Sequence, residues 1–288
     1  MIINKNTQNL ILIMLVLALF LSATVQYSYG SIYVGIFFII LAIILLSRLK
    51  TEKAIAIKLP KFYAIPKFYA ILGLLILISD IVYNYTAKSE LGTIDTMTFL
   101  LGSSLIAYEV NNDQARKMGL FGACMSTSFI ILYIIFYNIL NEYLYIFDSY
   151  FVMTPSVYLG KVLGLPLEIV ATETLKMYDG SGLQIKIGGP CSGLYSMFLL
   201  LSIIIGYSIT ENIRDIRRLI GIGVITALIA YIANLFRVTT LYIVAYFYGY
   251  DAMMTAHVHL GWILFAVTAL IVVYLLSKIE YLSPKTSF

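Results

Sequence analysis

Residues 219–250 read LIGIGVITALIAYIANLFRVTTLYIVAYFYGY, and the only charged side chain among them is that of Arg237. About 20 consecutive apolar residues are enough for a helix to cross the roughly 30 Å hydrocarbon core of a bilayer. The stretch is too long for one simple crossing, but the part after Arg237 is too short for a second one. We therefore predict one transmembrane helix that is extended or broken on its outer side.

The rest of the sequence is also rich in apolar residues and poor in charged residues. Of its 288 residues 61% are apolar and only 12% are charged, which excludes a soluble globular protein. The net charge of +4 gives no reason to expect nucleic acid as a partner. The sequence predicts an all-α polytopic membrane protein with about eight transmembrane helices. The apolar runs are 9–25, 31–47, 68–85, 94–110, 120–140, 191–210, 219–242 and 257–277.

The chain divides at its one long loop between apolar runs. We expect an N-terminal half with five spans (1–140), a loop on the outer face (141–190) and a C-terminal half with three spans (191–288). Most of the 19 basic residues lie at the chain ends and in the short loops facing away from residues 141–190. The positive-inside rule therefore places both termini in the cytoplasm and the long loop outside.

The long loop carries signals for structure of its own. Thr154 and Pro155 form an N-cap and first-turn pair, which predicts a short helix ending near Gly164. An extended run at 168–178, a Gly-containing turn and alternating residues at 183–187 predict a β-hairpin on the outer membrane surface. We thus expect a small α/β-hairpin insertion before the sixth span.

The sequence has only two cysteines and two histidines, so the possible role of each one can be considered separately. Cys191 follows Pro190 at the start of the sixth span, where free backbone amides and the helix dipole favour a reactive thiolate. The alternative is that Cys191 is a small apolar residue at the interface, which is our reading of Cys124 in mid-span. Two cysteines and two histidines fit neither a disulfide framework nor a metal site, and we predict no metal and no cofactor.

Arg237 is the second candidate, because a cation within a span costs about 2.5 to 3.5 kcal/mol at the membrane centre. Asn234 lies one turn earlier on the same face, although a purely anchoring arginine near the interface is the alternative. His257 and His259 open the eighth span at the same outer depth. His257 shares a face with Gly261, whereas His259 points away. A thiol, a guanidinium and an imidazole on one side suit nucleophilic acyl transfer.

These residues stand in three short motifs: Pro-Cys-Ser-Gly-Leu at 190–194, Asn-Leu-Phe-Arg at 234–237 and His-Val-His-Leu-Gly-Trp at 257–262. In that order and at helix ends, they resemble the exosortase/archaeosortase superfamily of membrane enzymes over about residues 155–277. The residues around Cys191 favour the archaeosortase branch. The resemblance implies that the first half of the chain is variable. It also implies site residues: Cys191, Arg237 and His257 as catalytic, and Asn234, Ser192, Gly193 and His259 as supporting.

The resemblance further implies a membrane-embedded cysteine transpeptidase. Its partners are exported proteins ending in a short motif, a hydrophobic helix and a basic tail, together with membrane lipid. The enzyme cleaves near the motif and transfers the new carboxyl end, through a thioester, to a membrane-linked acceptor on the extracytoplasmic side of the cell membrane. Two alternatives stay open: a thiol protease that uses water as the acceptor, and a non-enzymatic transporter or lipid-binding protein.

Overall fold

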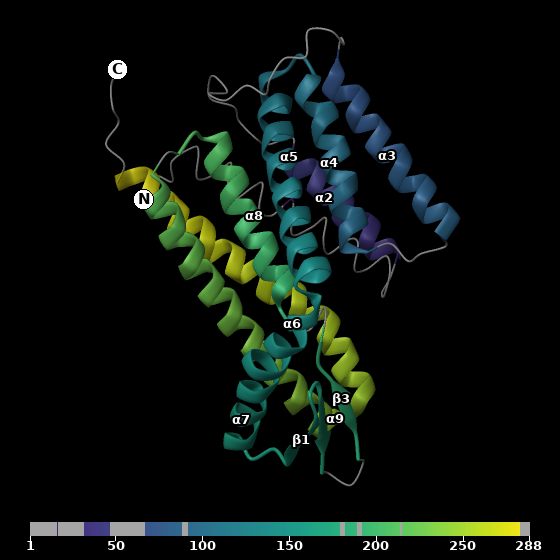
Figure 1. Cartoon of the computed structure of the whole chain (residues 1–288), viewed down its shortest axis with the longest axis vertical. Coiled ribbons are helices and arrows are strands. Elements are labelled where there is room, and N and C mark those ends of the chain that lie inside the picture. Colours follow the sequence, from purple (N-terminus) through teal and green to yellow (C-terminus); the bar gives the residue numbers. More distant parts are fainter. Residues whose placement is uncertain are drawn as a thin grey trace. The chain divides into compact units, whose positions relative to one another are not determined.

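The computed structural model describes residues 16, 32–46, 67–87, 92–178, 182–188, 192–213 and 215–282. They are mostly helical, as the sequence predicts (Figure 1). The elements in chain order are α2 (Ile32–Leu46), α3 (Phe68–Ala87), α4 (Thr93–Glu109), α5 (Asp113–Tyr133), the π-helix η1 (Ile134–Ile139), α6 (Asn141–Ile146), the π-helix η2 (Phe147–Met153), α7 (Thr154–Val162), β1 (Leu167–Ala171), β2 (Thr174–Met177), β3 (Gln184–Lys186), α8 (Leu194–Thr210) and α9 (Ile216–Leu282).

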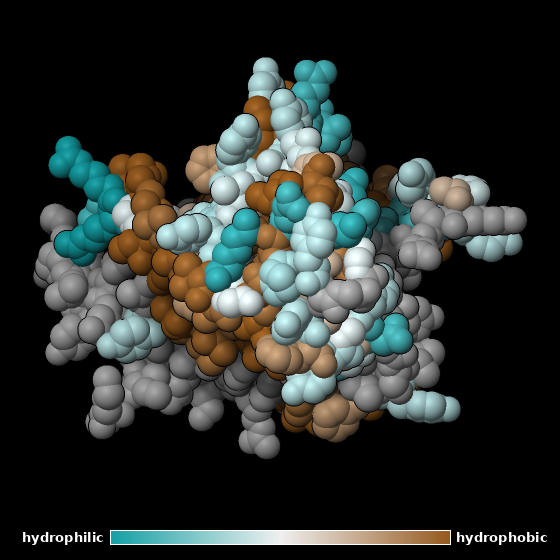
Figure 2. All heavy atoms as spheres, turned by 90° about the horizontal axis from the view of Figure 1, so that it is seen from below, coloured by the Kyte–Doolittle hydropathy of each residue, from teal (hydrophilic) through white to brown (hydrophobic). Residues whose placement is uncertain are grey.

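Three helical stretches of the described residues are long and apolar enough to cross a membrane: Phe68–Ala87, Asp113–Ile139 and Ile216–Val272. Helix α8 is apolar but shorter. The predicted first span, 9–25, lies outside the described residues except for Val16. Large apolar side chains are exposed along the helices, and Figure 2 shows apolar surface beside polar groups on the face seen from below. The helical membrane class is thus supported, while eight spans stay a prediction.

Helix α9 contains a break, as expected for the stretch 219–250. Gly249 has φ 82° and ψ −178°, so the helix divides there into two limbs (Figure 1). A positive φ of this kind is readily adopted only by glycine. Each limb is long enough to cross about 30 Å of hydrocarbon at roughly 1.5 Å per residue.

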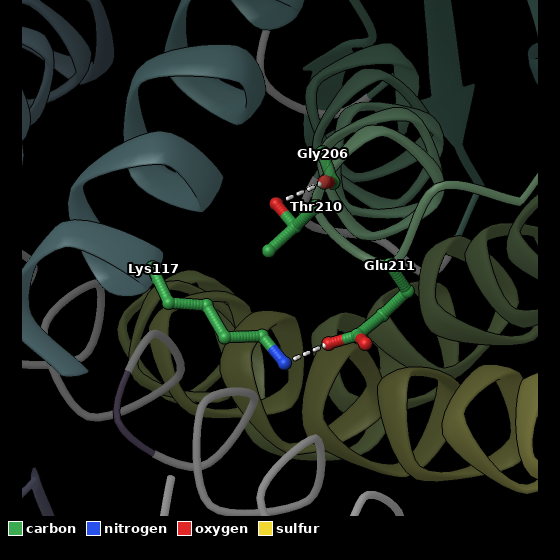
Figure 3. Close-up of polar contacts among 4 residues, drawn as sticks. All are labelled: Lys117, Gly206, Thr210 and Glu211. Atoms are coloured by element: carbon green, nitrogen blue, oxygen red, sulfur yellow. Dashed lines mark hydrogen bonds and ion pairs between the residues drawn. The ribbon is translucent and has the colours of Figure 1, made fainter. Parts of the chain in front are cut away.

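The chain forms two compact units. The first consists of 1–132, 199–224 and 273–288. In it the backbones of α3 and α4 approach closely at Gly73 and Gly102, where a Cβ on Gly102 would lie 2.8 Å from the Gly73 carbonyl oxygen. Close approach at small residues is a common mode of helix packing in membranes. Lys117 at the start of α5 pairs with Glu211 just after α8 (Figure 3).

The second unit consists of 133–198 and 225–272, and it contains the whole sheet. Strands β1, β2 and β3 form an antiparallel sheet in that order. Its buried face shares one apolar core with α7 and both limbs of α9. The core residues from the strands and helices include Val157, Leu167, Leu175, Met177, Ile187, Val238, Tyr242 and Met253.

Two details of the predicted insertion are wrong. The extended run 168–178 is not one strand, because the chain turns at Thr172 and Glu173 and forms β1 and β2, giving three strands instead of two. Thr154 is not an N-cap, because α6 and η2 already continue the helical path from Asn141. Its hydroxyl instead donates backward to the Ser149 carbonyl at 2.8 Å.

Candidate active site

Arg237 and His257 face each other from the two limbs of α9. Arg237 Nη2 lies 3.4 Å from both Nδ1 and Nε2 of His257. The reversal at Gly249 brings the two limbs together (Figure 1). Because a guanidinium only donates hydrogen bonds, it can bond only to the one imidazole nitrogen that carries no proton, so this contact requires a neutral ring. A ring in that state can take up a proton from a neighbouring group.

Gly261 provides the space for this contact. A Cβ at Gly261 would lie 3.3 Å from Nη2 and 3.5 Å from Cζ of Arg237. The guanidinium therefore lies directly against the backbone at Gly261, one turn beyond His257. The shared helix face of His257 and Gly261 thus carries both contacts to Arg237.

Asn234 connects the same limb of α9 to the turn before α8. It is only 7% exposed, and its side chain lies against Gly193, which has φ 81°. A Cβ on Gly193 would lie 2.5 Å from Asn234 Cγ. The motif at 234–237 is therefore in direct contact with the motif at 190–194.

Ser192 is buried beside Gly193, with 3% of its surface exposed. Its hydroxyl accepts a hydrogen bond from the Leu194 amide at 3.4 Å. Cys191, the preceding residue, lies outside the described residues, and its place relative to Arg237 and His257 stays a prediction. The arrangement brings together Ser192, Gly193, Asn234, Arg237, His257 and Gly261 within one compact unit.

His259 and Cys124 are not part of this arrangement. His259 is exposed, and the described structure gives it no contact with Arg237. Cys124 belongs to α5, in the compact unit that does not contain Arg237. The described residues include no group of three histidine, cysteine, aspartate or glutamate side chains placed to hold a metal ion.

Sequence reasoning missed a cluster of three tyrosines next to the site. The rings of Tyr133, Tyr137 and Tyr195 all contact one another, with centroid distances of 4.8 Å between Tyr133 and Tyr137, 5.2 Å between Tyr137 and Tyr195, and 5.9 Å between Tyr133 and Tyr195. The Tyr137 hydroxyl is buried, and Tyr195 directly follows the motif at 190–194 in the chain. The signal that could have found part of this cluster is the i,i+4 spacing of Tyr133 and Tyr137, which places them on one helix face.

The fold and the site together define a helical membrane protein with a buried asparagine and a paired arginine and histidine beside a glycine turn. The sequence matches the family model described as Transmembrane exosortase (Exosortase_EpsH) over residues 29–274. The chain belongs to this family. Searches of curated proteins and of solved structures find no match.

Proposed function

We propose that this protein is a membrane-embedded cysteine transpeptidase that removes a C-terminal sorting signal from exported proteins. Family membership supports a membrane transpeptidase or protease. The observation that carries the proposal is the contact between Arg237 Nη2 and the His257 ring at 3.4 Å, beside the turn that follows Cys191. The residues around Cys191 favour the archaeosortase branch of the family.

In the proposed reaction His257 takes the proton of Cys191, and the thiolate attacks the carbonyl carbon of the scissile peptide bond. A C–S bond forms, and the negative charge moves to the carbonyl oxygen. When the intermediate collapses, the C–N bond breaks and the leaving amine takes the proton from His257. The acceptor then loses its proton to His257, attacks the thioester and releases Cys191, which regains its proton.

Arg237 has two tasks in this scheme. Its contact with His257 orients the neutral ring until the ring takes up the proton, and the guanidinium can then donate to the developing oxyanion or a substrate carbonyl. Asn234, Ser192 and Gly193 position the turn that leads from Cys191 into α8. His259 is a supporting residue at the outer interface. The scheme requires no metal and no cofactor.

The proposed partners are exported proteins ending in a short motif, an apolar helix and a basic tail, with membrane lipid as the source of the acceptor. A substrate anchored by its own helix would present its scissile bond at a constant depth. We propose that both termini are cytoplasmic and that the site is extracytoplasmic. In support, the pair Lys117–Glu211 joins two of the loops assigned to the cytoplasm.

The second candidate is a thiol protease with the same residues, in which water is the final acceptor. The two activities differ in the mass of the product, because hydrolysis leaves a free carboxyl group and transfer leaves the acceptor attached. A transporter or lipid-binding protein is the third, weaker possibility. It would have no need for a buried Asn234 against Gly193 next to a cysteine.

The test is to express the full chain with an exported protein from the source organism that ends in a motif, apolar helix and basic tail. Mass spectrometry of that protein should show loss of the tail and a bound acceptor. Cys191→Ala should abolish this processing, and Cys124→Ala should not. Normal processing by inserted Cys191→Ala would refute a covalent cysteine mechanism.

A further inference from the structure

Strand β3 is an edge strand of the sheet. It spans Gln184–Lys186 and pairs on one side with β2, through the partners Leu175 and Ile185. No further strand of the described chain lies on its other side. An edge strand of this kind presents backbone groups that can bind another extended chain.

The register shows which groups of β3 are presented. The Met177 amide donates to the Leu183 carbonyl at 2.9 Å, and the Ile187 amide donates to the Glu173 carbonyl at 2.8 Å. The backbone groups of 183, 185 and 187 therefore face β2. Because backbone groups alternate along a strand, those of Gln184 and Lys186 point away from the sheet. Within the described part of the chain no backbone group bonds to either of them.

The edge is firmly attached to the part of the protein that carries the site. Ile187 is 2% exposed in a core that also contains Val238, and Ala256 packs against that core. Val238 and Ala256 are the chain neighbours of Arg237 and His257. The position of β3 is thus coupled by packing to both limbs of α9.

The edge is also near the proposed nucleophile in the chain. Lys186 and Cys191 are five positions apart in the chain, so their Cα atoms are at most about 18 Å apart. That distance corresponds to about five residues of an extended chain, which is a typical strand length. An extended peptide bound along β3 is therefore long enough to span this distance.

We infer that the free edge of β3 binds the substrate segment next to the scissile bond as a fourth, added strand. This inference rests on the proposed function and names the way in which its substrate is held. Hydrogen bonds between backbones would supply affinity that depends little on side chains, while the neighbouring side chains of the protein select among substrates.

The edge of β1 is less suited to this task. The Leu167 amide, which points away from β2, already donates to the Leu165 carbonyl at 3.0 Å. Strand β1 also follows α7, whereas β3 precedes the motif that contains Cys191. Both facts favour β3 as the edge that binds the substrate.

Proline tests the inference because it removes one outward N–H and leaves the bonds to β2 intact. Lys186→Pro should lower kcat/KM about threefold to tenfold against Lys186→Ala, the expected range for one lost hydrogen bond. The alanine control is necessary because both changes remove the Lys186–Glu173 ion pair of 3.3 Å. Gln184→Pro against Gln184→Ala should behave in the same way, and the double proline variant should multiply the losses.

The folded state of each variant is checked by the rate at which a small maleimide alkylates Cys191 in a Cys124→Ala background. If a proline variant does not fold, a synthetic peptide of the substrate's C-terminal region with single N-methyl groups is assayed with the unaltered chain. Loss of cleavage at every second N-methylated position supports strand addition. Equal cleavage at all positions refutes it.

The proposed function and the proposed strand addition can be refuted by different results. If Cys191→Ala processes the substrate normally, the proposed function is wrong. If Cys191→Ala is inactive but both proline variants equal their alanine controls, only the strand addition is wrong. A photo-crosslinker placed at Gln184 should capture the substrate, and capture of a second copy of the chain instead would also refute it.

Discussion

Gly193 and Asn234 are in such close contact that the structure has no room for a Cβ between them. A Cβ on Gly193 would lie only 2.5 Å from Asn234 Cγ, and Gly193 also has φ 81°. The motif at 190–194 therefore requires glycine at 193, because the side-chain amide of Asn234, from the motif at 234–237, occupies the space that a Cβ would need. This relationship makes the two motifs one structural unit.

Gly193→Ala should strongly reduce processing, because the left-handed backbone costs about 1 to 2 kcal/mol for alanine and the Cβ would displace Asn234. The measurement is processing of a co-expressed substrate per amount of inserted protein. Gly221→Ala is the matched control, since a Cβ there meets nothing within 4 Å. Equal activity of the two variants would show that the contact is dispensable.

Arg237→Lys should lose at least about tenfold in kcat/KM, although the charge is kept. The planar guanidinium can bind His257 and a second acceptor together, whereas an ammonium is a compact point charge. The assay compares Arg237→Lys with Arg237→Ala. If Arg237→Lys retains full activity, Arg237 is only an anchor at the interface.

His257→Ala should abolish processing, while His259→Ala should retain most of it. His257 contacts Arg237 at 3.4 Å, and His259 is exposed. Both single variants are measured with the same substrate at the same level of inserted protein. The reverse result would move the proton-transfer role to His259, and two active variants would remove histidine from the mechanism.

Tyr242→Phe should lower stability without changing the chemistry. The Tyr242 and Ser156 hydroxyls are 3.1 Å apart and buried, so the change leaves Ser156 without this partner. The expected loss is about 1 kcal/mol in the free energy of unfolding, measured by thermal unfolding in detergent. Ser156→Ala combined with Tyr242→Phe should cost less than the sum of the two single changes.

Cysteine substitutions in a Cys124→Ala, Cys191→Ala background test the orientation in the membrane. An impermeant maleimide added to intact cells should label Lys176→Cys, on β2, but not Lys117→Cys or Lys285→Cys. The reason is the bias of basic residues toward the cytoplasmic loops. Labelling of Lys117→Cys with protection of Lys176→Cys would invert the proposed topology.

The helices could be predicted from the sequence because the apolar runs are long and charged residues lie near their ends. The runs 68–85 and 94–110 correspond closely to α3 and α4. The helix period was also enough to place His257 and Gly261 on one face, and the structure has both against Arg237. Their catalytic roles were not decided by the pattern and stay proposals.

The insertion was harder to predict because its signals are local and weak. The turn between β1 and β2 contains Thr172 and Glu173, without the glycine or asparagine that usually marks a tight hairpin. The helical segment at 141–153 includes the π-helix η2, whose period differs from that of an α-helix. The contact between Asn234 and Gly193 depends on packing between distant segments, which no periodicity reveals.

The break at Gly249 has a consequence for how the protein is assembled. Arg237 and His257 are separated by 20 positions and meet within a single helical hairpin. A contact between segments so near in the chain can form as soon as the hairpin enters the bilayer, because it requires only a short loop to close. The two limbs of one hairpin can therefore bring Arg237 and His257 into contact during insertion, so that the guanidinium enters the bilayer together with a polar partner.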